Sequence, residues 1–158
     1  MKRDAEFSSC GSYRYSLSRV WDESLPAVLF IMLNPSSADG TKDDPSIRRC
    51  IFYAKDWGFG GLFVGNLFAL KSTKPAGLLE SANPEGPENL KYILKLSSHC
   101  KLIVCAWGNG PTLKKLSAYS PKNLNRKLHC LKLSLDGIPC HPLYLPKHLK
   151  PIEWKAGS

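Results

Sequence analysis

The sequence predicts an α/β protein, a three-layer α/β/α sandwich in which helices cover both faces of a mostly parallel sheet. Three apolar runs, 28–33, 62–70 and 102–107, have the length and composition of buried strands. Segments with the apolar spacing of amphipathic helices lie between them. Nearly continuous apolar character is typical of parallel strands, which are buried on both faces. Strands that alternate with helices in this way give the three-layer arrangement.

The length and composition of the chain indicate one globular domain over residues 1–158. A chain of 158 residues buries a core without disulfide bonds or metals, and 43% of these residues are hydrophobic. No internal repeat or low-complexity segment interrupts it. No apolar run reaches the roughly 20 residues of a membrane span. We therefore expect a monomer with no membrane partner.

The cysteine pattern and the N-terminus predict a reducing, cytoplasmic environment. No two cysteines form a CxxC pair, and the charged N-terminus is not followed by the apolar core of a signal peptide. An iron–sulfur cluster held by four cysteines is an alternative, but their spacings match no ligand pattern. We expect no metal and no cofactor. The positions concerned are Cys10, Cys50, Cys100, Cys105, Cys130 and Cys140.

The first half of the chain begins with a predicted edge strand. Residues 12–21 alternate apolar and polar side chains, as a half-buried strand does. After the strand at 28–33, a helix is predicted over 46–57. Either Asp43 or Asp44 can cap this helix, because both precede Pro45, which is well suited to a first helical turn.

The second half continues the alternation of strands and helices. The run 62–70 is expected to be a central strand, and a helix is expected over 88–98. A further strand at 102–107 leads into a helix at 112–118. The last expected strand covers 129–133.

Two asparagines stand out because each lies at or within a buried strand. Asn34-Pro35 ends the run 28–33, and the carboxyl ends of strands are where open α/β sheets bind ligands. The alternative is that Asn34 only opens an Asx turn. Asn66 interrupts an apolar run, and a buried amide without hydrogen bonds costs about 1–3 kcal/mol. Asn66 therefore either holds a neighbouring loop or reaches into a pocket.

Positive charge is concentrated in the C-terminal part of the chain. Residues 1–90 carry ten Lys and Arg against eleven Asp and Glu, whereas residues 91–158 carry twelve against two. A surface of this kind can follow the phosphates of a nucleic acid, but an ordinary solubilising surface has the same composition. The basic residues include Lys114, Lys115, Lys122, Arg126, Lys127, Lys132, Lys147 and Lys150.

Short motifs along nearly the whole chain resemble a bacterial and phage family known as domain of unknown function 1643. The resemblance implies a bacterial or phage origin, and the family name supplies no function. The motifs are Leu33-Asn34-Pro35-Ser36, Asp44-Pro45-Ser46-Ile47-Arg48-Arg49-Cys50, Gly60-Gly61, Asn66-Leu67-Phe68-Ala69, Ala106-Trp107-Gly108 and His141-Pro142-Leu143-Tyr144-Leu145.

A more distant resemblance connects the chain with the uracil-DNA glycosylase superfamily. The order of features is similar: a strand ending in Asp-Pro or Asn-Pro, a strand bearing a base-reading Asn, a strand ending in Trp-Gly, and a His-Pro loop. The chain departs from this pattern, since it lacks the usual Gly before the first landmark, the Ser after His-Pro and an aromatic that stacks on the base. The landmarks here are Asn34-Pro35, Asn66, Trp107-Gly108 and His141-Pro142.

The glycosylase resemblance implies a role for each landmark. Asn34 would orient the attacking water through its side-chain carbonyl, and His141 would donate a hydrogen bond to the departing base. Asn66 carries a donor and an acceptor, which suits the Watson–Crick edge of an extruded base. His141 can also be an ordinary turn histidine, and Trp107 can simply fill the end of the sheet. The implied substrate-binding set is Pro35, Ser36, Ser37, Asn66 and Trp107.

The same resemblance implies contacts with DNA outside the pocket. The segment 143–145 would wedge into the duplex in place of the extruded base, although packing of a C-terminal loop explains it equally well. Arg48 and Arg49 lie near a helix N-terminus and would contact phosphates, or they would pair with Asp43 and Asp44. The expected DNA-binding set is Arg48, Arg49, Leu143, Tyr144, Leu145, Lys147 and Lys150.

These implications lead to a monofunctional DNA glycosylase that flips out a damaged or modified pyrimidine, from double-stranded DNA, and hydrolyses its N-glycosidic bond. The loop 36–44 is rich in small polar residues, which predicts a wide pocket for a bulky base such as a modified phage cytosine, and a role in antiphage defence. Ser36, Ser37, Thr41 and Asn66 would bond the adduct. The alternatives are a non-catalytic nucleic-acid-binding protein on the same fold and a hydrolase of a free modified nucleoside or nucleotide.

Overall fold

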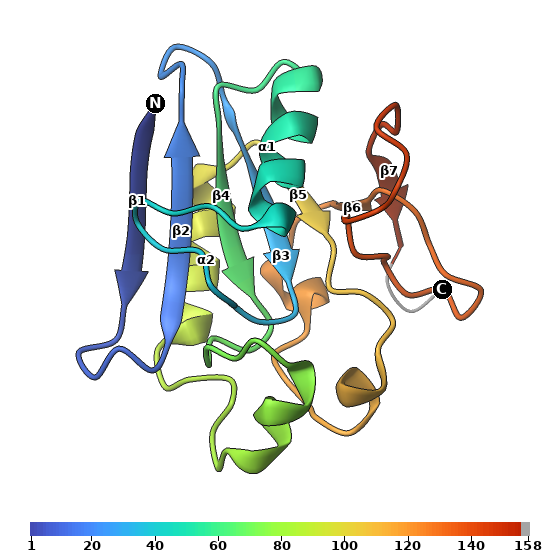
Figure 1. Ribbon diagram of the computed structural model, residues 1–158. Helices are drawn as coiled ribbons and strands as arrows, with labels where there is room; N and C mark the ends of the chain where they lie inside the picture. The colour runs from blue at the N-terminus through green and yellow to red at the C-terminus, as the bar shows by residue number, and fades with distance from the viewer. Residues whose placement is uncertain (156–158) are drawn as a thin grey trace.

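The computed structural model describes residues 1–155 and shows an α/β fold built on a mixed sheet (Figure 1). Within these residues the sheet has seven strands in the order β1-β2-β4-β3-β5-β6-β7. The parallel pairs are β4 with β3, β3 with β5, and β5 with β6. The strands are β1 (Lys2–Phe7), β2 (Arg14–Val20), β3 (Ala27–Met32), β4 (Gly61–Asn66), β5 (Leu102–Cys105), β6 (Leu128–Cys130) and β7 (Ile152–Trp154).

The prediction of a mostly parallel sheet is wrong. Of the six strand pairings within residues 1–155, three are antiparallel: β1 with β2, β2 with β4, and β6 with β7. Parallel pairing is confined to the centre of the sheet, where the apolar strands lie. The antiparallel strands at the edges are charged or short, and they do not have the continuous apolar character that predicts strands from sequence.

The prediction that residues 12–21 form an edge strand is also wrong, although the strand itself exists as β2. β1 occupies the edge position and pairs with β2 from Lys2, opposite Val20, to Phe7, opposite Arg14. All but one of the side chains of β1 are exposed, because the sequence of this strand is mainly charged. β2 is therefore an inner strand, and charged side chains on it are buried.

Two α-helices lie on opposite sides of the sheet, α1 (Pro45–Asp56) in front and α2 (Asn89–His99) behind (Figure 1). Both were predicted within two residues of their ends. Asp44 is the N-cap of α1, since its Oδ1 accepts the backbone N–H of Ile47 at 2.9 Å. The short 3₁₀ helices are η1 (Pro75–Glu80), η2 (Pro111–Lys114) and η3 (Pro121–Leu124).

Several further predicted elements are shorter than expected: the strand expected at 102–107 ends at Cys105, and the one expected at 129–133 is β6, which ends at Cys130. The strand at 62–70 ends at Asn66, where the chain turns along the tip of β3: the backbone N–H groups of Leu67 and Phe68 donate to Met32 and Leu33. The apolar run continues because residues 67–69 are buried, and burial does not require a strand. The helix expected at 112–118 is only the single turn η2, which starts at Pro111.

The core is divided by the sheet into two apolar clusters, one under each helix. Phe30 of β3 faces α1, where it stacks with Trp57 at a ring distance of 6.0 Å. The neighbouring Leu29 points to the other face and belongs to the cluster around Ile93 of α2. This alternation along β3 places both faces of the central strands in apolar surroundings.

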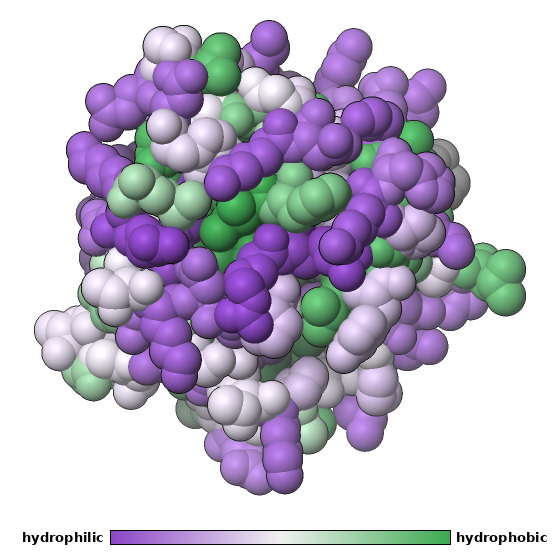
Figure 2. Space-filling model, turned by 45° about the horizontal axis from the view of Figure 1, so that its top comes forward, coloured by the Kyte–Doolittle hydropathy of each residue, from purple (hydrophilic) through white to green (hydrophobic). Residues whose placement is uncertain are grey.

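The C-terminal segment, red in Figure 1, runs beside α1 and is fastened to it. Tyr53 donates its hydroxyl to the carbonyl of Pro146 at 2.7 Å, and the indole of Trp57 donates to Leu149 at 3.0 Å. Figure 2 shows a molecular face on which hydrophilic side chains predominate around a short apolar band. None of the helices in residues 1–155 is long and apolar enough to span a membrane.

Candidate functional site

A cavity of about 540 Å³ lies at the carboxyl ends of the central parallel strands. β3 contributes Asn34 just past its end, β4 contributes Asn66 as its last residue, and β5 leads into Trp107. Ser36 and His141, from the following loop and the C-terminal segment, also line this cavity. Parallel strands end at one edge of a sheet, so residues far apart in sequence converge there.

Two of the predicted substrate-binding residues do not line the cavity. Pro35 is buried beside it, and its carbonyl accepts the backbone N–H of Ser72 at 3.0 Å. Ser37 is exposed. Thr41, expected to bond an adduct, is exposed as well and holds the carboxylate of Asp39 instead, at 3.2 Å. Of the loop 36–44, Ser36 at its start and Asp44 at its end line the cavity, whereas Ser37 and Thr41 do not.

The amide of Asn34 is fixed by two backbone carbonyls. Its Nδ2 donates to Ser72 at 2.9 Å and to Pro35 at 3.0 Å. Its Oδ1 has no hydrogen-bond partner within residues 1–155, and no backbone N–H donates to it as an Asx turn requires. Asn34 therefore offers the cavity a hydrogen-bond acceptor whose orientation the protein sets in advance.

Asn66 is 1% exposed, and neither atom of its amide has a hydrogen-bond partner in the described part of the chain. Its backbone carbonyl, in contrast, accepts from Asn89 Nδ2 at 2.9 Å and from the hydroxyl of Tyr119 at 3.1 Å. Each unpaired group costs about 1–3 kcal/mol when buried. Because the residue lines the cavity, a ligand bound there is the natural partner for both amide atoms.

His141 is held as a neutral ring with a defined tautomer. Its Nδ1 accepts the backbone N–H of Leu143 at 3.1 Å, so the ring proton of the neutral form sits on Nε2. Burial lowers the pKa of His141, and the negative charge of Asp44 opposes this shift. His141 packs against Gly108, since a β-carbon added to this glycine would lie 3.4 Å from the His141 Cβ.

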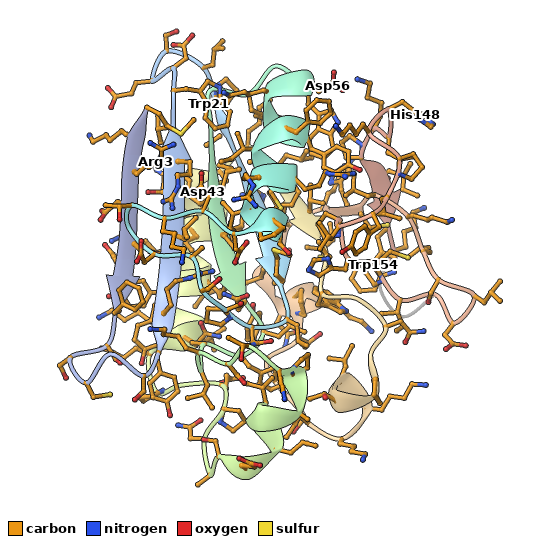
Figure 3. The ribbon with its side chains drawn as sticks, in the orientation of Figure 1. Arg3, Trp21, Asp43, Asp56, His148 and Trp154 are labelled. Carbon is orange, nitrogen blue, oxygen red and sulfur yellow. The ribbon has the colours of Figure 1, made fainter. Side chains whose placement is uncertain are left out.

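Trp107 packs at the end of the sheet, as one of its two interpretations predicted, and it also lines the cavity. Its ring meets Trp154 of β7 edge-on, with 5.4 Å between centroids, and the remaining surface lines the cavity. Trp154 is labelled in Figure 3, on the side of the sheet that carries the C-terminal segment. The wall of the cavity is therefore supported by the antiparallel strand at the far edge.

A buried arginine of β2, Arg19, holds the loop 36–44 in place. Its Nε donates to Asp43 Oδ1 at 2.8 Å, and its Nη2 donates to the carbonyls of Asp39 and Lys42 at 2.6 and 3.2 Å. Arg3 and Asp43 lie close together on this side of the sheet (Figure 3), with Nη2 and Oδ2 3.9 Å apart. The loop between Asn34 and α1 is thereby anchored to an inner strand.

A second buried arginine, Arg14, lines the cavity and was not found from the sequence. It is 3% exposed, and its Nη1 donates to the carbonyl of Ala38 at 3.0 Å. Its Nε has no partner among residues 1–155. Burial lowers its pKa to about 10. In the sequence Arg14 belongs to the polar half of an apparent edge strand, and only the position of β1 reveals that it is buried.

The two arginines predicted to contact phosphates differ in their surroundings. Arg48 is exposed, and its Nη1 donates to the carbonyl of Asp43 at 3.3 Å. Arg49 is half-buried, and its Nη1 donates to the carbonyl of Leu145 at 2.5 Å. Neither pairs with the carboxylate of Asp43 or Asp44 in the structure. Arg48 is the more accessible of the two for a phosphate contact.

The three residues predicted as a wedge also differ. Tyr144 is 89% exposed and has a positive φ of 71°, a conformation that non-glycine residues rarely adopt. Leu143 is half-buried, and Leu145 packs against the cluster beneath α1. Tyr144 is thus the projecting side chain of the segment, three residues from His141.

Lys147 and Lys150 lie on the outer side of α1. The Lys147 ammonium sits 5.2 Å from the centre of the Phe52 ring, and Lys150 Nζ is 2.9 Å from Asp56 Oδ2. Asp56 and the neighbouring His148 are labelled in Figure 3. Both lysines are exposed and remain available for contacts with a partner.

The fold is that of an α/β protein with a cavity at the carboxyl ends of its central strands. The family model described as protein of unknown function (DUF1643) matches residues 14–143, and the chain belongs to this family. No curated protein and no solved structure matches the chain. No group of three or more His, Cys, Asp or Glu side chains in residues 1–155 is arranged to hold a metal ion.

Proposed function

We propose that this protein is a monofunctional DNA glycosylase that hydrolyses the N-glycosidic bond of a damaged or modified pyrimidine. The observation that carries the proposal is the unpaired, buried amide of Asn66 in the same cavity as Asn34 and His141. An amide in this position matches a pyrimidine's hydrogen-bonding edge, where donors and acceptors lie side by side. A uracil-DNA-glycosylase-like fold is part of the proposal, supported by the parallel centre of the sheet with a helix on each face.

The chemistry follows from what each side chain offers. The bond between the sugar C1′ and the base nitrogen breaks, and the base leaves as an anion with the electron pair. A water oxygen adds to C1′ and loses one proton to solvent, and the released base takes up one proton from solvent. Asn34 Oδ1 accepts a hydrogen bond from this water and orients it. The His141 Nε2–H donates to the carbonyl oxygen of the departing base, where negative charge develops.

The cavity also supports the monofunctional form of the reaction. A bifunctional glycosylase needs an amine to attack C1′, and no lysine is among the residues that line the cavity in residues 1–155. Asn34 and His141 are not amine nucleophiles. Water is therefore the nucleophile in the proposed mechanism, and the products are a free base and an abasic site.

Bulky modified cytosines of phage DNA are the proposed substrates, with a role in antiphage defence. The cavity of about 540 Å³ is larger than the ring of an unmodified pyrimidine requires. Double-stranded DNA would present the base in an extruded form, with Tyr144 next to the gap it leaves. The basic surface of the C-terminal part supports binding of the phosphates.

The direct test is base release from defined duplexes. Duplexes carrying uracil, mismatched thymine, hydroxymethylcytosine or glucosylated hydroxymethylcytosine are incubated with the protein and treated with alkali, and strand breaks at the base are measured. We expect breaks at the modified cytosines. Breaks only at uracil would indicate an ordinary uracil-repair enzyme. Binding without breaks would favour the non-catalytic alternative. Release from free nucleosides but not from DNA would favour the nucleoside hydrolase.

The variant Asn34→Ala tests the catalytic role proposed for Asn34. It should reduce base release by several orders of magnitude while DNA affinity is kept. Because Asn34 donates to two carbonyls, the substitution should also lower the free energy of unfolding by about 1–2 kcal/mol. The control is Asn109→Ala: this amide bonds Asp136 at 3.1 Å, is exposed and lies outside the cavity. Equal activity of Asn34→Ala and wild type would rule out the role assigned to Asn34.

A further inference from the structure

The guanidinium of Arg14 is a buried donor that the protein leaves partly unsatisfied. Of its nitrogens, Nη1 donates to Ala38 at 3.0 Å, whereas the buried Nε has no partner in residues 1–155. None of the ion pairs in that part of the chain includes it. Removing a charged donor from water without giving it an acceptor is unfavourable. Since Arg14 lines the cavity, a bound ligand can supply the missing acceptor.

The position of Arg14 is fixed before any ligand arrives. Its backbone N–H donates to Ala69 at 2.9 Å, which ties the start of β2 to the segment that follows β4. Its side chain is tied to Ala38, in the loop that Arg19 anchors. The direction of the free Nε–H is therefore set by the fold, as recognition of a defined group requires.

Asp44 supplies the opposite chemistry in the same cavity. Its Oδ1 accepts the N-terminal N–H of α1 at Ile47, and no other hydrogen bond to its carboxylate is present within residues 1–155. Asp44 and Arg14 both line the cavity, yet they are not within ion-pair distance. Arg14 thus brings a cationic donor and Asp44 an anionic acceptor to the same cavity, near enough to each other that the charge of Asp44 raises the pKa of Arg14 against the effect of burial.

We propose that Arg14 and Asp44 form a specificity subsite for a hydroxyl-bearing substituent on the excised base, which rests on the proposed function above. A hydroxyl group accepts a hydrogen bond from Arg14 and donates one to Asp44. A carboxylate or phosphate substituent would be repelled by Asp44, and an ammonium group by Arg14. A methyl group, or no substituent, leaves both charged groups unpaired, and a site built for hydroxyls rejects such analogues strongly.

The subsite takes the role first expected of Ser37 and Thr41. Ser37 and Thr41 are exposed, and neither lines the cavity. Arg14 and Asp44 are both cavity residues and both charged, so they discriminate more sharply than neutral hydroxyls. Asn66 remains the reader of the base ring, whereas Arg14 and Asp44 read what is attached to it.

The test measures binding separately from cleavage. Each duplex carries one 2′-fluoro-substituted nucleoside, because the fluorine makes the N-glycosidic bond resist hydrolysis. The base is cytosine, 5-methylcytosine, 5-hydroxymethylcytosine or glucosylated 5-hydroxymethylcytosine. Affinity is measured by fluorescence anisotropy. We expect wild type to prefer the hydroxyl-bearing bases over 5-methylcytidine by at least about tenfold, in line with a hydrogen bond to a charged group. Comparison of the last two duplexes shows whether a hydroxymethyl group suffices or a sugar is required.

The variants locate the preference. Arg14→Met and Asp44→Asn should each reduce it at least about tenfold while affinity for unmodified DNA is kept, and Arg14→Lys should retain part of it. The control Arg3→Met removes an exposed arginine outside the cavity and should change nothing. Circular dichroism checks that each variant is folded. If Arg14→Met does not fold, Arg14→Lys and Asp44→Asn still test the subsite.

Failure of the subsite and failure of the glycosylase proposal give different results. If wild type prefers hydroxyl-bearing bases but releases none from ordinary substrates, the subsite stands and the catalytic proposal falls. If wild type shows no preference, or if Arg14→Lys and Asp44→Asn keep the full preference, the subsite is refuted whatever the catalytic activity.

Discussion

The Nδ1 of His141 accepts the backbone N–H of Leu143 at 3.1 Å, and this contact places the proton of the neutral ring on Nε2. From the sequence, the histidine of a His-Pro segment can be assigned as a donor only if a partner fixes its tautomer. The structure supplies that partner two residues further along the chain. Burial lowers the pKa of the ring below its ordinary value of 6.5, so the neutral form predominates at neutral pH.

The first prediction concerns the pH dependence of stability. The folded chain binds the His141 proton more weakly than the unfolded chain, so the free energy of unfolding should decrease as the pH falls below 6.5 and through the lowered pKa. Protonation also removes the acceptor for Leu143. His141→Gln, which does not titrate, should lose less stability than wild type between about pH 7.5 and 5 in urea unfolding.

The control for this prediction is His148→Gln, because His148 lies on the same segment and is exposed. It should follow the wild-type pH dependence. His141→Ala should in addition lower the rate of base release by about 10²–10³, as expected for the loss of one donor to developing charge. Identical pH dependence in wild type and His141→Gln would contradict the assignment of a half-buried, neutral ring.

The second prediction concerns Arg19, which anchors the loop 36–44. Arg19→Met should lower the free energy of unfolding by about 3–5 kcal/mol, because it leaves the Asp43 carboxylate and four backbone carbonyls without this donor. Urea unfolding at fixed pH measures this loss. Arg3→Met, which removes a longer and exposed contact to the same carboxylate, should cost less than about 1 kcal/mol.

Double substitution separates the ion pair from the carbonyl contacts. If Arg19 acts mainly through Asp43, then Asp43→Asn should make a subsequent Arg19→Met much less costly than in wild type. If the costs add, the contacts of Arg19 with backbone carbonyls carry the effect. A cost below 1 kcal/mol for Arg19→Met alone would show that the loop does not depend on this arginine.

The sequence predicts the convergence of Asn34, Asn66, Trp107 and His141 because each follows a recognisable strand or turn signal. Strand tips can be located from apolar runs, and the tips of parallel strands meet. The place of Arg14 in the cavity could not be predicted in this way. Its side chain is buried and donates to Ala38 of the loop 36–44, and it lies on an inner strand that looks like an edge strand because the charged sequence of β1 has no apolar periodicity.

The limits of the sequence prediction at the sheet edges have the same origin. β1 is held by backbone pairing with the next strand, β2, and β7 by pairing with the short and distant β6, while the side chains of β1 and β7 themselves are mostly exposed. Backbone pairing leaves no mark on the choice of side chains. For this reason the parallel centre of the sheet could be predicted from the sequence, whereas the antiparallel edges could not.

The third prediction concerns the projecting Tyr144. Tyr144→Gly removes a side chain that is almost wholly exposed from a backbone conformation that favours glycine, so the free energy of unfolding should rise by about 1 kcal/mol. If the ring wedges into the duplex, base release should nevertheless fall. Unstacking is measured by the fluorescence of 2-aminopurine placed next to the target base.

Tyr144→Phe is the matched variant, since it keeps the aromatic ring and the positive φ. It should retain both the stability and the base release of wild type. A stabilised Tyr144→Gly protein with full unstacking and full base release would show that this residue only closes a turn. The wedge would then have to be Leu143, because Leu145 is packed against the core.

The last prediction concerns the basic surface beside α1. Lys147 and Lys150 are exposed, and the pair that Lys150 makes with Asp56 is a surface ion pair, so Lys147→Glu with Lys150→Glu should cost less than about 1 kcal/mol of stability. DNA affinity should fall for all sequences alike. The slope of log affinity against log salt should decrease by about 2, because each neutralised phosphate contributes about 0.9.

Lys2→Glu with Lys95→Glu changes the net charge equally, at residues that lie outside the cavity and line grooves elsewhere on the molecule. If both double variants weaken binding to the same extent, the effect reflects net charge alone; a much larger loss at Lys147 and Lys150 places the phosphates beside α1, on the same segment as His141.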